Sequence, residues 1–175
     1  MIPTVEIDDR QVQHFIRVSP KRAEWALREA LAAAGGHLRK KIAGFIKRGG
    51  AGWPPLSAAT IRMKRELAGQ HKFHTKPLEI FARLVRFKVG KSKGALQVRV
   101  GFFNTKSWFK NYYGTGAATI ASLHETGNRS SRHGRRPVRP MVGPVWQRER
   151  GKMPKYIEDK FFKNFFGGKR PDLRI

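Results

Sequence analysis

The feature that most limits the possible folds is a long run of apolar residues spaced three and four positions apart. The run follows Ser19-Pro20, a favourable helix start because Ser caps a helix and Pro is tolerated in the first turn. It predicts a long amphipathic helix whose apolar stripe is Leu27, Leu31, Ala34, Leu38, Ile42 and Phe45. We expect Gly35-Gly36 to bend this helix or divide it in two, and Gly49-Gly50 to end it.

A second pattern, with a period of two residues, predicts a β-hairpin. Val85, Phe87 and Val89 alternate with Arg86 and Lys88, and further on Leu96, Val98, Val100 and Phe102 alternate with Gln97 and Arg99. The segment Gly90 to Gly94 between them suits a hairpin loop. One face of the hairpin is therefore expected to be apolar and buried, and the other cationic and exposed.

The remaining elements are shorter. We expect a strand and a helix within Met1 to Val18, a second helix at Ser57 to Leu67, and one or two helical turns at Ala117 to Glu125. A last strand or extended segment should follow at Arg139 to Pro144, and Pro154 should open a terminal helix that aligns Ile157, Phe161 and Phe165 and ends at Gly167 and Gly168. Loops are expected at Gly69 to Pro77, at Asn104 to Gly116, at the mobile basic segment 126–136 and at the basic tail 168–175. A length of 175 residues suits a single domain.

Charge is the strongest compositional signal. The chain has 37 Lys and Arg against 12 Asp and Glu, which gives a formal net charge of +25. Such a field repels itself unless a polyanion or an acidic protein surface neutralises it. Nucleic acid is the default partner for a chain of this kind, and an acidic ring of partner subunits would satisfy the same electrostatics. A hydrophobic fraction of 39% indicates a folded chain all the same.

Cysteine and membrane signals are both missing from the sequence. Without Cys there are no disulfides and no Cys-based zinc sites, which fits synthesis in a reducing cytoplasm. No apolar run has the length of a membrane span, and Met1 to Arg10 carries three acids and no apolar stretch, unlike a secretory signal. We expect a protein that is made and assembled in the cytoplasm without a membrane partner.

Catalytic and metal-binding patterns are weak. The adjacent acids, Asp8-Asp9 and Glu158-Asp159, do not form a convergent acid–base site. His71, His74 and the pair His124-Glu125 do not match the helical two-His motif that recruits zinc. We therefore expect no enzymatic activity, no metal and no cofactor.

Aromatic and basic residues lie close together at Trp108-Phe109-Lys110 and in the hairpin. A platform that stacks bases needs its aromatics and cations on one face, whereas in the hairpin the two kinds alternate and so face opposite ways. Phosphate contact stays open, because charge alone drives it.

Three segments, taken in order, carry a family resemblance. The first is Gly52-Trp53-Pro54-Pro55-Leu56-Ser57 followed by Thr60 and Lys64, and the second runs from Pro77 to Val89 into a strand. The third begins with Ala121-Ser122-Leu123-His124-Glu125-Thr126-Gly127, passes through a basic loop and ends with Arg136-Pro137-Val138-Arg139-Pro140-Met141-Val142-Gly143. Together they resemble the virion-morphogenesis or tail-completion family of tailed bacteriophages. That family includes proteins of Mu-like phages and is related to neck and tail-terminator proteins.

The resemblance implies a fold, a role and a set of partners. The fold is α+β, with a small, mainly antiparallel β-sheet packed against a long N-terminal helix and with a C-terminal helix. The role is that of a non-enzymatic structural protein in the virion, at the junction of head and tail. Its partners are further copies of itself in a ring, commonly sixfold, together with the tail tube protein and the head stopper or connector. Non-specific DNA contact is a further possibility.

The resemblance and the basic loop together select the candidate site residues. The candidates for partner interfaces are Trp53, Pro54, Pro55, His124, Glu125, Gly127, Arg129, Arg132, Arg135 and Arg136. Pro137, Pro140 and Gly143 are expected to be structural, the prolines by holding the chain extended. Charge alone favours the alternative of a sequence-independent, cytoplasmic nucleic-acid-binding protein. A small basic nuclease is a third hypothesis, which the missing acid and metal cluster disfavours.

Overall fold

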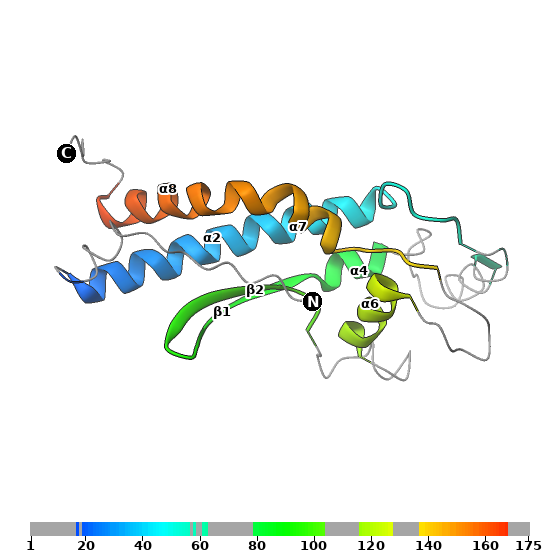
Figure 1. The fold of residues 1–175 in the computed structure, drawn as a ribbon, viewed down its shortest axis with the longest axis horizontal. Coiled ribbons are helices and arrows are strands. Elements are labelled where there is room, and N and C mark those ends of the chain that lie inside the picture. The colour runs from blue at the N-terminus through cyan, green and yellow to red at the C-terminus, as the bar shows by residue number, and fades with distance from the viewer. Residues whose placement is uncertain are drawn as a thin grey trace. The chain divides into compact units, whose positions relative to one another are not determined.

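The computed structural model describes residues 17, 19–56, 58, 61–62, 79–103, 116–127 and 137–167. The predictions for residues 1–18, 57–67, 69–77, 104–116 and 168–175 lie wholly or largely outside these ranges, as does the basic loop beyond Gly127. The elements, labelled in Figure 1, are α2 (Pro20–Lys47), α4 (Glu79–Leu84), β1 (Arg86–Ser92), β2 (Ala95–Gly101), α6 (Ala117–Thr126), α7 (Gly143–Glu149), the 3-10 turn η1 (Arg150–Lys152) and α8 (Met153–Phe165).

The chain forms two compact units. The hairpin unit comprises Ile2–Leu38, Phe87–Val100 and Trp146–Ile175. The motif unit comprises Arg39–Arg86 and Gly101–Val145, together with Met1. The single domain expected from the chain length stays a prediction.

Helix α2 starts where the sequence predicts. The Ala23 N–H donates to the Ser19 carbonyl (2.9 Å), and Pro20 is the first helical residue. The helix then continues without a break to Lys47, so the prediction that Gly35-Gly36 divides it is wrong. The predicted stripe is buried, except that Leu27 is half-buried. At the C-terminal end the Gly50 N–H donates to the Phe45 carbonyl, and Gly49 and Gly50 both adopt positive φ, which glycine accepts without strain.

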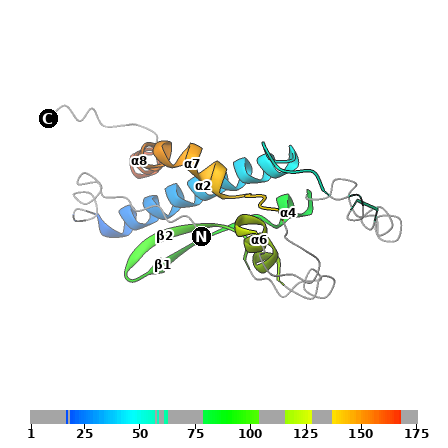
Figure 2. The same cartoon turned by 45° about the vertical axis from the view of Figure 1, so that its right-hand side comes forward.

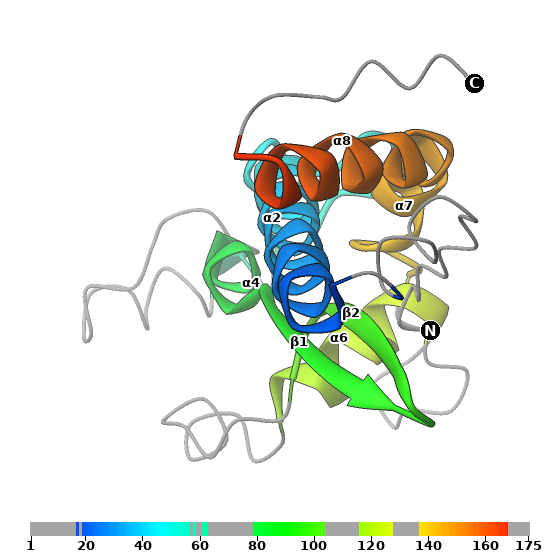
Figure 3. The same cartoon turned by 90° about the vertical axis from the view of Figure 1, so that its left-hand side faces the viewer.

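Gly35 has a packing role that the sequence prediction did not include. In the hairpin unit, a Cβ atom built on Gly35 would lie 2.7 Å from Phe87 Cδ2 and 2.8 Å from Val98 Cγ2. Real Cβ atoms do not approach other atoms this closely, so only glycine lets the hairpin pack directly on the helix backbone. Figure 3 shows β1 and β2 on one side of α2 and α8 on another.

The hairpin confirms the predicted alternation. Arg86, Lys88 and Arg99 are exposed, whereas Val98 and Val100 are buried and Phe87 and Val89 are half-buried. Its turn is tighter than expected, because only Lys93 and Gly94 separate the strands, with φ of 50° and 81°. Two-residue hairpin turns of type I′ need positive φ at both positions, which Gly94 provides freely and Lys93 at some cost.

The face of α2 that meets α8 is lined by alanine. Ala23, Ala26, Ala30 and Ala34 are fully buried, and at helical steps of three and four residues they lie between Arg22 and His37. Arg22 stacks over the Phe165 ring of α8 (5.4 Å), and the His37 ring lies 5.0 Å from that of Tyr156. These two contacts make α8 antiparallel to this part of α2, as Figure 1 also shows. In Figure 2, α8 lies on the opposite side of α2 from the hairpin. The small alanine row therefore receives the large buried residues of α8, which are Met153, Ile157, Phe161, Phe162 and Phe165.

The predicted terminal helix is confirmed as α8, with Pro154 in its first turn and Gly167 at positive φ after its end. The helix over Ala117 to Glu125 is also confirmed, as α6. Of the two alternatives predicted for Arg139 to Pro144, a strand or an extended segment, the strand is wrong, because residues 137–142 have no regular structure and α7 begins at Gly143. The long helix, the two-stranded antiparallel sheet and the C-terminal helix confirm the α+β class.

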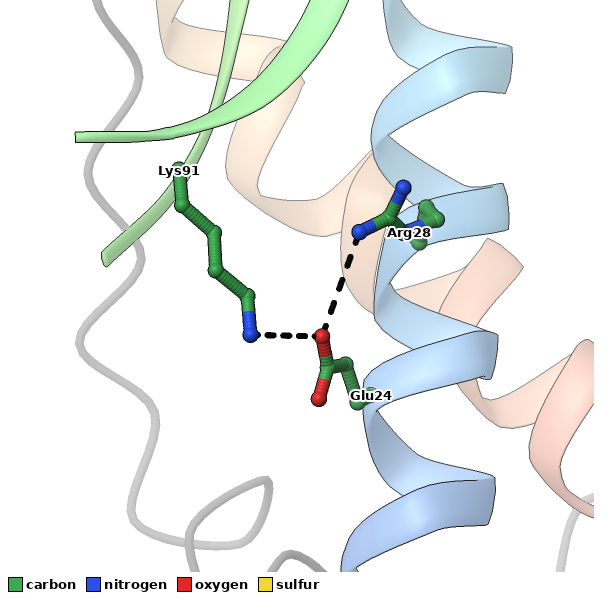
Figure 4. Close-up of polar contacts among 3 residues, drawn as sticks. All are labelled: Glu24, Arg28 and Lys91. Carbon is green, nitrogen blue, oxygen red and sulfur yellow. Dashed lines mark ion pairs between the residues drawn. The ribbon is translucent and has the colours of Figure 1, made fainter. Parts of the chain in front are cut away.

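One ion pair ties the hairpin to α2 besides the apolar contact at Gly35. The Lys91 Nζ atom lies 2.7 Å from Glu24 Oε1, and Arg28 lies 3.9 Å from the same oxygen (Figure 4). The hydrogen bond and charge of Lys91, with a smaller contribution from Arg28, hold the pKa of Glu24 below its ordinary value. The contact is thus fully formed near neutral pH and is lost as the pH falls through that lowered pKa.

We expect the two neighbouring glycines of α2 to respond to alanine with opposite signs. Gly35→Ala should destabilise the protein by about 1–3 kcal/mol through overpacking against Phe87 and Val98. Gly36→Ala places its Cβ 4.0 Å from Phe87, an ordinary contact, and should stabilise the helix by up to about 1 kcal/mol. Urea unfolding of both variants measures the difference. Equal stabilisation by both would contradict the close approach at Gly35.

The Glu24 carboxyl should titrate below the ordinary glutamate pKa of 4.5 in an NMR pH series. In Lys91→Gln its pKa should rise toward that value, because the hydrogen bond and most of the favourable charge are removed. Arg28→Gln is the matched control and should raise the pKa less, since Arg28 is the more distant partner. A Glu24 pKa that is the same in the parent and in Lys91→Gln would show that the ion pair does not form in solution.

Candidate functional site

Trp53 is the first of the predicted interface residues that the structure locates. Its indole Nε1 donates to the Pro140 carbonyl (3.0 Å), 87 positions away in the sequence. The ring packs edge-on against Phe45 of α2, with centroids 5.6 Å apart, and also lies on Gly50, where a Cβ atom would overlap it. Trp53 is half-buried, so the indole joins the end of α2 to the segment around Pro140.

Arg139 makes the second connection to the same passage. Its Nε donates to the Pro54 carbonyl (3.1 Å) and its Nη2 to the Pro55 carbonyl (2.9 Å). The side chain is only 5% exposed, and burial lowers the pKa of the guanidinium from its usual value. Arginine stays charged in such a site, and within the described residues it forms no ion pair, so the two carbonyl dipoles stabilise its charge.

The third connection runs from the end of α6 to the same segment. The Arg139 N–H donates to the His124 carbonyl (2.7 Å), one of the carbonyls that a helix end leaves without a partner inside the helix. Gly127, at φ 73°, ends α6 in a conformation that glycine accepts without strain. The His124 ring packs edge-on against Phe81 of α4 at 5.7 Å, so α4 and α6 meet in the core of the motif unit.

Glu125 completes these connections. One carboxylate oxygen, Oε1, accepts hydrogen bonds from the backbone N–H groups of Met141 (2.6 Å) and Val142 (2.5 Å). These N–H groups lie immediately before α7, where no helical carbonyl can accept them. A charged acceptor there forms stronger hydrogen bonds than a neutral one, so Glu125 fixes how the chain enters α7.

These contacts form one motif network, made of Trp53, Pro54, Pro55, His124, Glu125, Arg139, Pro140, Met141 and Val142. It joins the Trp53 passage, the end of α6 and the segment before α7, all within the motif unit. The contacts are mostly between side chains and backbone, and each restrains a loop. The arrangement is suited to holding a surface in shape.

The structure places the other predicted residues around this network. The Pro54 and Pro55 rings are exposed while their carbonyls bind Arg139, and Pro137 is exposed beside Val138, which is 49% exposed. Gly143 is half-buried next to Glu125. The network therefore presents apolar groups to solvent. Arg129, Arg132, Arg135 and Arg136 lie outside the described residues.

Arg139 is the residue that the sequence prediction missed. Arg139 lies within the third segment of the resemblance, where the prediction assigned a structural role to Pro137 and Pro140 and none to Arg139. The available signal was its setting, because an arginine in a proline-rich extended segment cannot use helical or sheet partners. The Pro54-Pro55 passage likewise lacks N–H donors and offers only carbonyls, which an arginine fork fits.

Among the described residues, no group of three or more His, Asp or Glu side chains is placed to hold a metal ion. In the same part of the chain, no helix has the length and apolar character needed to cross a bilayer.

Comparison with known proteins gives no match: no protein-family model, no curated protein and no solved structure is similar to the chain.

We expect the motif network to be energetically coupled. Arg139→Lys keeps the charge but loses the paired Nε and Nη2 donors of the guanidinium. It should destabilise the protein by about 1–3 kcal/mol, because the Pro54 and Pro55 carbonyls are no longer both bound. Trp53→Phe removes one neutral hydrogen bond and should cost about 1 kcal/mol. The double variant should deviate from the sum by at least about 0.5 kcal/mol, because both side chains hold the same two segments.

Urea unfolding of the two single variants and the double variant measures this coupling. Arg83→Lys, at an exposed position of α4, is the control and should change stability by less than about 0.5 kcal/mol. Strict additivity, together with a neutral Arg139→Lys, would show that the network does not act as a unit.

Proposed function

We propose that the protein is a non-enzymatic structural component of a tailed-bacteriophage virion, acting at the head–tail junction in tail completion, tail termination or as a neck protein. In this role it forms a closed ring, commonly of six subunits, that caps the tail tube and permits joining to the DNA-filled head. Its partners are its own copies, the tail tube protein and the head stopper or connector. Assembly takes place in the host cytoplasm.

The observation that carries the proposal is the motif network. The first and third segments of the resemblance contact each other through Trp53, Arg139 and Pro140. The residues joined by these hydrogen bonds are 84 to 87 positions apart in the sequence. Sequence similarities that arise by chance have no reason to converge in space. Segments that interlock to hold one surface in shape are what a ring-forming subunit requires.

The exposed groups of the network favour contact with other proteins. Pro54, Pro55, Pro137 and Val138 give the surface an apolar, conformationally stiff character. Apolar groups suit the core of a protein interface, with charged groups at its rim. In a ring, the same surface of each subunit contacts a different surface of its neighbour, and the assembly closes when the rotation permits.

The alternative is a sequence-independent nucleic-acid-binding protein of the cytoplasm. A net charge of +25 favours it and gives affinity for any polyanion at low salt. It does not account for the motif network, which uses one cation and one carboxylate to order loops. The two hypotheses differ in location, since only the first requires the protein in finished particles.

Purified virions that carry a labelled copy of the subunit provide the direct test. Reconstruction should place the label in a closed ring between head and tail. Absence from mature particles, or presence only as scattered single copies, would reject the proposal and leave the nucleic-acid alternative.

A second arm of the same experiment tests the basic loop. Neutralising Arg129, Arg132, Arg135 and Arg136 together should abolish head–tail joining while tails keep their normal length, if the loop docks against an acidic partner. The matched control neutralises four exposed cations of α2, which are Lys21, Arg39, Lys40 and Lys41. Normal joining and infectivity after the loop change would exclude a docking role for that loop.

A further inference from the structure

The outer face of the hairpin, which points away from α2, has a composition that the motif network does not explain. The two-residue turn places Ser92 opposite Ala95, and counting back along both strands places Lys88 opposite Arg99 and Gly90 opposite Gln97. Lys88 and Arg99 thus extend from the same face, side by side. Phe87 and Val98, which belong to the opposite face, pack on Gly35 of α2, so the face of Lys88 and Arg99 points away from α2.

Two like charges directly opposite each other in a β-ladder destabilise it. Lys88 and Arg99 are both exposed, and neither has an ion-pair partner among the described residues. By contrast Lys91, on the face toward α2, is neutralised by Glu24. The hairpin sequence has no acid between Arg86 and Gly101, so the outer face has no neutralising group of its own.

Gly90 adds a second, independent feature. Gly90 lies in the middle of β1, and the pair Gly90 and Gln97 comes between the turn and the pair Lys88 and Arg99. A Cβ atom built on Gly90 meets nothing within 4 Å. Because no protein atom crowds this position, packing does not require a glycine there. A glycine inside a strand, facing open space, lets another molecule approach the backbone closely.

We propose that the outer face of the hairpin, formed by Lys88, Gly90, Gln97 and Arg99, binds duplex nucleic acid, with the two cations on phosphates and the ribbon lying in or along the major groove. A two-stranded β-ribbon has the width that the major groove of B-DNA admits. The proposal goes beyond the head–tail role and depends only on the residues of the hairpin unit.

The composition of the face favours nucleic acid over an acidic protein. The outward residues from Lys88 to Arg99 are Lys88, Gly90, Ser92, Ala95, Gln97 and Arg99, and none has a large apolar side chain. Stable protein interfaces have a core of buried aromatic or aliphatic anchors and few charges in it. Protein–DNA interfaces are more polar and much more positive, as this face is.

The test uses the full chain and a short fluorescent duplex DNA of mixed sequence, with binding followed by anisotropy over a series of salt concentrations. In the double variant Lys88→Gln/Arg99→Gln, the slope of log affinity against log salt should become shallower by about 1.8, because each lost phosphate contact contributes about 0.9. The control Lys40→Gln/Lys41→Gln removes the same charge from exposed positions of α2 and should keep the parent slope. An equal reduction in both double variants would overturn the site, since it would reflect net charge alone.

Gly90→Val separates binding from folding. Valine favours a strand and its side chain meets open space, so the thermal midpoint should stay the same or rise, while affinity for the duplex should fall because the close approach is blocked. Parent-like affinity in Gly90→Val would overturn the proposal. A second outcome would also overturn it: the full chain binds poly-glutamate more tightly than duplex DNA of matched charge, and Lys88→Gln/Arg99→Gln loses the poly-glutamate binding. That result would assign the face to an acidic protein.

Discussion

The motif unit depends on the two hydrogen bonds that the Arg139 guanidinium donates to the carbonyls of Pro54 and Pro55. The Trp53 passage contains two residues without an N–H group, so it cannot be held by ordinary backbone pairing. A buried guanidinium provides the missing donors from a segment about 85 positions away. Because Arg139 also donates its backbone N–H to α6, this single residue fixes the mutual arrangement of three pieces of chain. Glu125 then transmits that arrangement to the start of α7.

Periodic patterns predicted the regular elements well. The stripe of α2, the alternation in the hairpin and the aligned residues of α8 each follow from repeated burial of one face, which a short window of sequence records. Gly35 was misinterpreted because helix propensity treats glycine as a local weakness. A glycine is needed at position 35 because Phe87 and Val98, which are distant in the sequence, approach the helix backbone there. Short α4 and α7 have no periodicity long enough to detect, and contacts made elsewhere in the chain decide their conformation.

The candidate site was predictable as a set of segments but not as a set of contacts. Trp53, Glu125 and Pro140 were named in advance, and all three take part in the motif network. Which atom bonds to which could not be inferred, since a side-chain bond to a backbone carbonyl leaves no complementary residue in the sequence. Arg139 illustrates the point, because its partners are main-chain groups that any amino acid would offer. The charge of the chain was equally visible. Only the hairpin register separates Lys91, which Glu24 neutralises, from Lys88 and Arg99, which have no ion-pair partner in the part of the chain that the structure describes.

The alanine row of α2 has a consequence for how such a chain can diverge. Four fully buried alanines face the phenylalanines of α8, so the volume of this contact is contributed almost wholly by one partner. A larger residue in the row requires a smaller one on α8, because close-packed interiors tolerate conserved volume and penalise excess. Substitutions on the two helices should therefore occur as compensating pairs. Positions on the outer side of α2 are free of this restriction, so drift in the sequence of α2 should concentrate there and leave the alanines in place.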